Sequence, residues 1–218
     1  MTRDQTSDYA YEKDPAAIYR QSFSIVRAEA DLSRLPVDLH PVAIRLVHSC
    51  GMTDLPLDLA WSEDLLDAAQ DAFSKRAPVF CDVEMVAHGI IKSRIPDSTE
   101  VVCTLNDPKV PDLAKRLGTT RSAAAVDLWR DRLEGAIVAI GNAPTALFHL
   151  LEMIADGGPK PALILGFPVG FIGAAESKDA LNTNPFGVPY LTVKGRRGGS
   201  AMAASAVNAL AAGLPEER

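Results

Sequence analysis

The sequence is poor in cysteine and has no long apolar run. Its three cysteines, Cys50, Cys81 and Cys103, are odd in number and form no C-x-x-C pair, which excludes a disulfide framework and a cysteine-built zinc site. The longest nearly apolar stretch, residues 161–175, is too short to cross a bilayer and is interrupted by glycine and proline. We therefore expect a protein of the reducing cytoplasm with no membrane partner.

Positive charge is also scarce, because 22 Lys and Arg residues stand against 28 Asp and Glu residues, a net charge of −6. A net acidic chain is a poor candidate for non-specific nucleic-acid binding, so no nucleic-acid partner is expected. The first 14 residues are polar and of mixed charge, which predicts neither a signal peptide nor an anchor. The 218 residues, 47% hydrophobic and 23% charged, are typical of a folded protein, and we expect one domain over residues 1–218.

Short apolar runs rich in β-branched residues predict five buried strands, and helix signals lie between them. The predicted strands are residues 79–81, 101–104, 136–140, 162–165 and 190–193. Asp82 and Thr120 are candidate N-caps of the helices that follow them, and about three more helices precede the first strand. This alternation predicts an α/β fold, a doubly wound five-stranded parallel sheet with extra N-terminal helices.

The loops after the last three predicted strands are rich in glycine: residues 141–145, 166–173 and 194–200. Ligands of open parallel sheets bind beyond the carboxyl ends of the strands, where helix N-termini and backbone N–H groups are exposed. Neither a P-loop nor a G-x-G-x-x-G motif is present, so a nucleotide site has little support. Tight turns and helix packing are the alternative explanation for these glycines.

Basic residues gather in the last of these loops. Lys194, Arg196 and Arg197 have no acidic neighbour between residues 185 and 200, which predicts a positive spot for an anionic ligand such as a carboxylate. Arg121, beside Thr120, adds charge at a helix N-terminus that already favours anions. A solvated basic turn is the alternative.

Among the four histidines, His48 is the candidate for chemistry, because Gly51 ends its helix and lets the side chain face a cavity. Histidine exchanges protons near neutral pH, although a structural role is the alternative for any single helical histidine. No histidine pair has metal-ligand spacing, so no metal is expected. The absence of G-x-S-x-G, and of a cysteine beside an evident base, disfavours hydrolase chemistry.

Nine segments in order resemble the precorrin-8X methylmutase family, and the resemblance covers about residues 8–210. They are residues 17–23 (AIYRQSF), 27–30 (RAEA), 46–51 (LVHSCG), 81–86 (CDVEMV), 120–124 (TRSAA), 141–147 (GNAPTAL), 166–171 (GFPVGF), 176–178 (ESK) and 198–201 (GGSA). The resemblance implies a flavodoxin-like fold and an isomerase of cobalamin biosynthesis. That activity moves a methyl group from C-11 to C-12 of precorrin-8X, gives hydrogenobyrinate and uses no cofactor.

The family's proton donor and acceptor is a histidine, which the matching motif places at His48. A [1,5]-sigmatropic methyl shift creates neither a nucleophile nor a leaving group, so the protein need only bind the macrocycle and protonate its conjugated system. The several carboxylates of the substrate call for basic and N–H donors around a broad apolar slot. The residues expected to bind substrate are Ser22, Arg121, Asn142, Lys194 and Arg196.

The resemblance further implies a homodimer with pockets between subunits and a possible handover of product to the next pathway enzyme. One departure is at residues 90–94 (IIKSR), where related enzymes often have threonine or serine, and no ligand contact is assigned there. Three alternatives stay open: a cobalt-precorrin-8 methylmutase of the anaerobic pathway, a noncatalytic corrinoid carrier, and a flavodoxin-like flavin or nucleotide protein.

Overall fold

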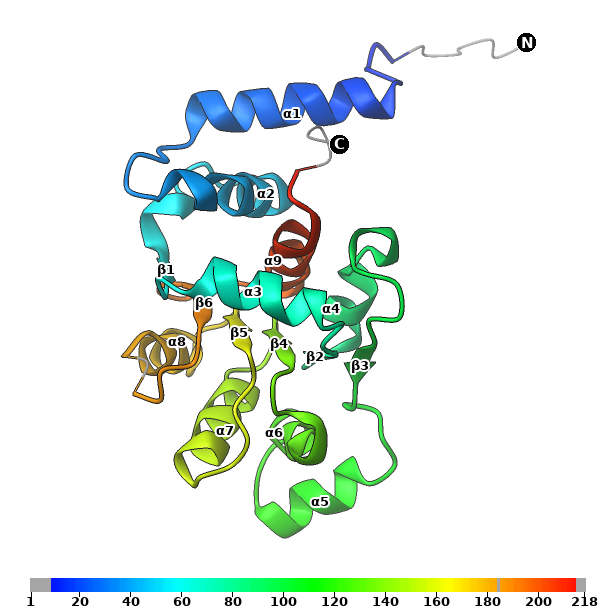
Figure 1. Ribbon diagram of the computed structural model, residues 1–218, viewed down its shortest axis with the longest axis vertical. Helices are drawn as coiled ribbons and strands as arrows, with labels where there is room; N and C mark the ends of the chain where they lie inside the picture. The colour runs from blue at the N-terminus through cyan, green and yellow to red at the C-terminus, as the bar shows by residue number, and fades with distance from the viewer. Residues whose placement is uncertain (1–8, 184, 215–218) are drawn as a thin grey trace, which may run out of the picture.

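A computed structural model describes residues 9–183 and 185–214, in which a six-stranded sheet lies between two layers of helices (Figure 1). The strand order is β1-β6-β5-β4-β2-β3. The strands are β1 (Leu59–Trp61), β2 (Val79–Cys81), β3 (Val101–Cys103), β4 (Ile137–Ile140), β5 (Leu163–Gly166) and β6 (Tyr190–Val193). The carboxyl ends of β4, β5 and β6 therefore lie next to one another, as do the loops that leave them.

The five predicted strands are all present and pair in parallel, but the expected count of five is wrong by one. The additional strand, β1, pairs antiparallel with β6, and Leu59 lies opposite Val193. Three residues are too few to show an alternating pattern, and β1 follows a proline-containing 3-10 turn, so no local signal marks it. The sheet is mixed because this edge strand runs against the others.

Each face of the sheet is covered by its own set of helices (Figure 1). On one face lie α1 (Pro15–Glu29), α2 (His40–Cys50), α3 (Leu65–Ser74), α4 (Glu84–Gly89) and α9 (Ser200–Ala212), with α1 packed outside α2. On the other lie α5 (Val110–Leu117), α6 (Arg121–Asp127), α7 (Pro144–Ala155) and α8 (Ala174–Thr183). Sequence reasoning missed α5, a short helix between two loops. None of the helices in residues 9–183 and 185–214 is long and apolar enough to cross a membrane.

The core is divided by the sheet. Along β4, Ile137 and Ala139 face the layer of α2, α3 and α9, whereas Val138 and Ile140 face the layer of α6 and α7, and all four are fully buried. A parallel sheet covered on both faces needs such continuous apolar strands. This packing holds the carboxyl edge of the sheet rigidly, so the loops at that edge start from defined positions.

Candidate active site

His48 lies in the last turn of α2, against the face that α1 covers. Its Nδ1 and the Oγ of Ser22 on α1 share a hydrogen bond of 2.8 Å. The rings of Phe23 and Tyr19 lie 4.9 Å and 5.7 Å from the imidazole, measured between centroids. Asp14 begins α1 by accepting a hydrogen bond from the N–H of Ala16, so α1 has a defined start and its register brings these three residues to the histidine.

The surroundings of His48 disfavour the charged form of its imidazole. Burial lowers the pKa of His48, and the positive charge of Arg45, one turn earlier on α2, lowers it further. Among the described residues, none forms a hydrogen bond with Nε2, whereas Nδ1 is held by Ser22. When the Ser22 hydroxyl donates to Nδ1, the ring proton is on Nε2, so the arrangement orients one nitrogen for proton exchange.

The loop after β4 is organised by Asp82, which follows β2. Its buried carboxylate accepts hydrogen bonds from the backbone N–H groups of Gly141 (2.8 Å), Asn142 (3.0 Å) and Ala143 (2.8 Å). Burial raises the pKa of Asp82, and the three N–H bonds oppose that rise because they stabilise the ionised form.

Two expectations are corrected by this geometry. Asp82 does not cap the helix that follows it, since α4 begins after Val83 and has no side-chain cap. The three backbone donors of the β4–α7 loop are taken by Asp82 and are not available to a ligand. What this loop offers outward is the exposed Asn142.

Arg121 is exposed at the first position of α6, directly after Thr120. Thr120 caps this helix as predicted, by accepting from the N–H of Ala123 at 3.2 Å, although α6 is shorter than expected and ends at Asp127. The guanidinium of Arg121 donates to the carbonyl of Leu105 at 3.0 Å, and no carboxylate of the described chain pairs with it. Its charge therefore remains available beside a helix N-terminus.

Lys194 and Arg196 lie in the β6–α9 loop, and both are exposed. The guanidinium of Arg196 lies over the ring of Phe171, 5.4 Å from its centroid, and its backbone carbonyl accepts from the N–H of Gly170 at 3.3 Å. These contacts join the β6–α9 loop to the β5–α8 loop. Within residues 9–183 and 185–214, neither Lys194 nor Arg196 forms an ion pair.

Arg197 differs from its neighbours because its charge is already paired. The predicted positive spot therefore contains Lys194 and Arg196 but not Arg197. Its guanidinium pairs with Asp54 at 2.8 Å and also with Asp58, both in the segment between α2 and β1.

The Nζ of Lys178, buried on α8, donates to the backbone carbonyl of Arg197. Burial, and then the charge of Arg197, lower the pKa of Lys178 to about 8. Lys178 and Asp82 both lie in family segments, but sequence reasoning gave neither of them these distant contacts, because no local signal marks them.

In a single chain, the predicted residues form two groups. The hollow at His48 is about 200 Å³ and is lined by residues of α1 and α2 and by Gly51 and Thr53, with Ser22 among them. Arg121, Asn142, Lys194 and Arg196 do not line it. The Arg197 ion pairs join the β6–α9 loop to the segment that follows α2, the helix that carries His48.

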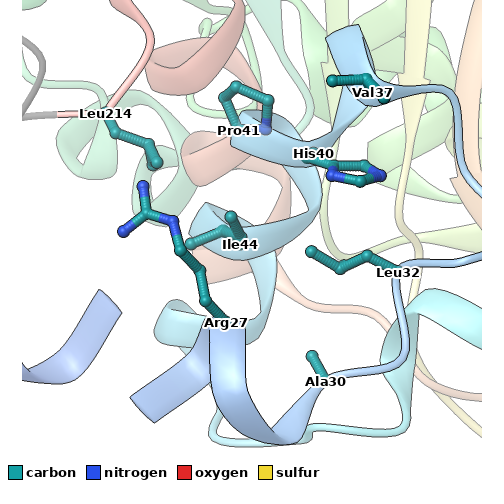
Figure 2. A pocket seen from close by; sticks show the side chains of 8 residues that line it. All are labelled: Arg27, Ala30, Leu32, Val37, His40, Pro41, Ile44 and Leu214. Carbon is teal, nitrogen blue, oxygen red and sulfur yellow. The ribbon is translucent and has the colours of Figure 1, made fainter. Parts of the chain in front are cut away.

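A more spacious hollow, of about 580 Å³, lies between the end of α1, the start of α2 and Leu214 (Figure 2). His40 lines it, but its Nε2 shares a hydrogen bond with the carbonyl of Leu35 at 3.2 Å. None of the predicted site residues is in this hollow, so its volume does not identify the chemistry. Among the described residues, no three His, Cys, Asp or Glu side chains are grouped as metal ligands.

Comparisons with known proteins agree with the resemblance. A family model described as precorrin-8X methylmutase matches residues 17–212. A precorrin-8X methylmutase of Pseudomonas aeruginosa is 58% identical over 201 residues, covering 92% of this chain and 97% of that protein. A cobalt-precorrin-8 methylmutase of Priestia megaterium is 36% identical, covering 90% of this chain and 87% of that protein. The crystal structure of a precorrin-8X methylmutase from Thermus thermophilus is 37% identical, has a TM-score of 0.81, and covers 89% of this chain and 94% of that one.

Proposed function

The chain belongs to the precorrin-8X methylmutase family, isomerases of cobalamin biosynthesis, and on that premise we propose that it moves a methyl group from C-11 to C-12 of precorrin-8X to give hydrogenobyrinate. The match over residues 17–212 is the observation that carries this proposal, because it spans nearly every element of the fold. His48 is the proton donor and acceptor of the reaction.

The geometry around His48 supports that role. A general acid or base works best when its pKa is near the working pH and its ring is held in one orientation. The 2.8 Å hydrogen bond to Ser22 and the flanking rings of Tyr19 and Phe23 hold the imidazole, and its half-buried position lowers its pKa. A neutral imidazole can take a proton and return it within one turnover, as an isomerisation without net proton change requires.

The macrocycle's carboxylates are bound by the exposed cations at the carboxyl edge of the sheet. Arg121, Lys194 and Arg196 have no carboxylate partner in the part of the chain that the structure describes, and a guanidinium or ammonium group bonds strongly to a carboxylate. Asn142 supplies an amide from the neighbouring loop, and the Ser22 hydroxyl contacts the substrate where it holds His48. Phe171, 83% exposed, contributes apolar surface for the ring.

The functional form is a homodimer with pockets between subunits. The 200 Å³ hollow at His48 is smaller than the ~300–1,000 Å³ typical of small-molecule pockets, so a second copy completes the enclosure. Exposed apolar side chains on α1, such as Ile18 and Ile25, and Ile172 in the β5–α8 loop, supply surface that a partner subunit buries. The whole chain, residues 1–218, acts as one domain in the cytoplasm and hands its product to the next enzyme of the pathway.

The five parallel strands make up the flavodoxin-like part of the fold. Numbered along the chain, they follow the order 2-1-3-4-5 that defines that type of doubly wound sheet, and the order reverses between β2 and β4. Asp82 and Asn142 follow these two strands, which puts part of the site at the position where such sheets bind their ligands.

Turnover of the purified protein with precorrin-8X and, separately, with cobalt-precorrin-8 tests the proposal. The visible spectrum of the macrocycle should change to that of hydrogenobyrinate with the metal-free substrate. Conversion of the cobalt substrate alone would assign the anaerobic reaction, whose Priestia megaterium relative is less similar. Binding of both compounds without conversion would indicate a carrier, and a yellow preparation with flavin absorbance would favour a flavin protein.

A further inference from the structure

Arg45 is an arginine whose burial the proposed reaction does not explain. It lies in the middle of α2, is 5% exposed, and its Nη1 has no hydrogen-bond partner in the described structure. A buried guanidinium nitrogen without a partner costs free energy, and an apolar side chain of similar volume is often equally or more stable in such a position. Stability alone therefore gives no reason for an arginine here.

The position of Arg45 relative to His48 does give a reason. The two residues are three apart on α2 and thus share a helix face. Tyr19 of α1 packs its ring 5.7 Å from the ring of His48. Burial lowers the pKa of Arg45, and Tyr19 opposes that lowering. Arg45 and His48 therefore lie on one face of α2, and Tyr19 of α1 packs against the imidazole.

We propose that Arg45 is a positioning residue that acts through His48, because its permanent positive charge is buried one turn from the imidazole on the same face of α2 and acts on the proton that the ring exchanges. This inference rests on the proposed acid–base role of His48. According to this inference, the buried charge of Arg45 serves the proton transfer and not the stability of the fold. A positive charge beside the ring disfavours a second positive charge on it, and burial in the helix contact strengthens that repulsion.

The other charged and titratable groups near His48 do not account for its state. On α2 itself there is Cys50, whose thiol has a pKa raised by burial. On α1 there are Tyr19 and Glu29, and Glu29 is exposed at the rim of the hollow. In the segment after α2, Asp54 is paired with Arg197. Of the charges around the ring, Arg45 is the one that lowers the pKa of His48, next to burial.

The direct test is an NMR titration of the His48 ring in the ligand-free protein, with its signal assigned by its loss in His48→Gln. In Arg45→Met, which keeps the length of the side chain and removes its charge, the titration midpoint should move to higher pH. Arg45→Lys keeps the charge and should titrate like the unmodified protein. Arg20→Met is the matched control, because Arg20 is an exposed arginine of α1 whose nearest carboxylate is Asp14 at 3.7 Å.

The His48 midpoint should lie at higher pH in Arg45→Met than in Arg20→Met, and the acid limb of kcat/KM should move in the same direction. An unchanged His48 midpoint in folded Arg45→Met would overturn the proposal. Arg45→Gln provides a second uncharged variant in case Arg45→Met does not fold. The titration needs no substrate. An unchanged midpoint would therefore overturn the role of Arg45 without affecting the proposed reaction, and the titration could still be interpreted if the proposed reaction were disproved.

Discussion

On the α1–α2 pair, His48 is half-buried, flanked by two aromatic rings and held by a 2.8 Å hydrogen bond, whereas at the carboxyl edge of the sheet Arg121 and Arg196 are exposed and unpaired with any described carboxylate. The first region removes its functional group from water and fixes its orientation. The second leaves its charges in water, and Asp82 anchors only the β4–α7 loop at this edge, through the N–H groups of Gly141 and Ala143.

This contrast follows from what each kind of group must do. A proton-exchanging side chain works through a pKa that burial and neighbouring charge can set, so it belongs where solvent is reduced. A residue that binds a ligand carboxylate must keep its charge free until the ligand arrives, because a prior ion pair would compete. Arg197, paired with Asp54 and Asp58, shows the outcome when that pairing is present.

Loss of His48 should have the largest effect, and it should change turnover but not ligand affinity. In His48→Ala, kcat should fall by about 10²–10⁴, because a general acid–base group is removed. Affinity for hydrogenobyrinate should change little, since no charged anchor is lost. Single-turnover kinetics and titration calorimetry of the same preparation measure both quantities, and near-normal turnover in the folded variant would remove His48 from the mechanism.

Loss of Arg121 should produce the opposite pattern. Charge-assisted hydrogen bonds contribute roughly 1.5–3 kcal/mol, so Arg121→Ala should bind hydrogenobyrinate about tenfold to a hundredfold more weakly while its melting temperature stays nearly unchanged. Lys194→Ala should behave similarly. Calorimetry at two ionic strengths makes the distinction, because a merely solvated basic residue would change affinity by less than about twofold and only at low salt.

The neighbours Arg196 and Arg197 allow a matched comparison within one loop. Arg196→Ala should weaken product binding severalfold without lowering stability. Arg197→Ala should lower the free energy of unfolding by about 1 kcal/mol, or the melting temperature by about 2–4 °C, because its ion pairs are partly exposed to water. Thermal melts and binding titrations of both variants check this. Equal stability losses in the two variants would contradict the assignment of different roles.

The smallest effect concerns the pH dependence of stability. The folded-state pKa of His48 is lowered, so the unfolded chain takes up a proton at a pH where the folded chain does not. Stability should therefore fall as pH drops below the ordinary histidine pKa of about 6.5. Denaturant unfolding at pH 7.5 and pH 5.5 measures it. His48→Gln should lose less stability than the unmodified protein over this interval, and an equal loss would argue against the lowered pKa.

The parallel strands and most helices were predictable because their signals are local. Buried parallel strands are continuous apolar runs, and caps such as Asp14 and Thr120 or breaks such as Gly51 mark helix ends within a few residues. The edge strand β1 was not predictable, because its three residues acquire their conformation from pairing with β6, far along the chain.

For the candidate site, the sequence by itself determined which residue types lie at helix ends and at the carboxyl ends of strands, and its motifs determined the family. Tertiary structure alone decided which of those groups are free. Arg196 and Arg197 are adjacent in sequence, yet only Arg197 meets Asp54 and Asp58, which are 143 and 139 residues away. It also gave the N–H groups of the β4–α7 loop to Asp82 and buried Arg45 without a partner for Nη1. Charge pairing and burial depend on distances in space, and a linear spacing of residues does not contain them.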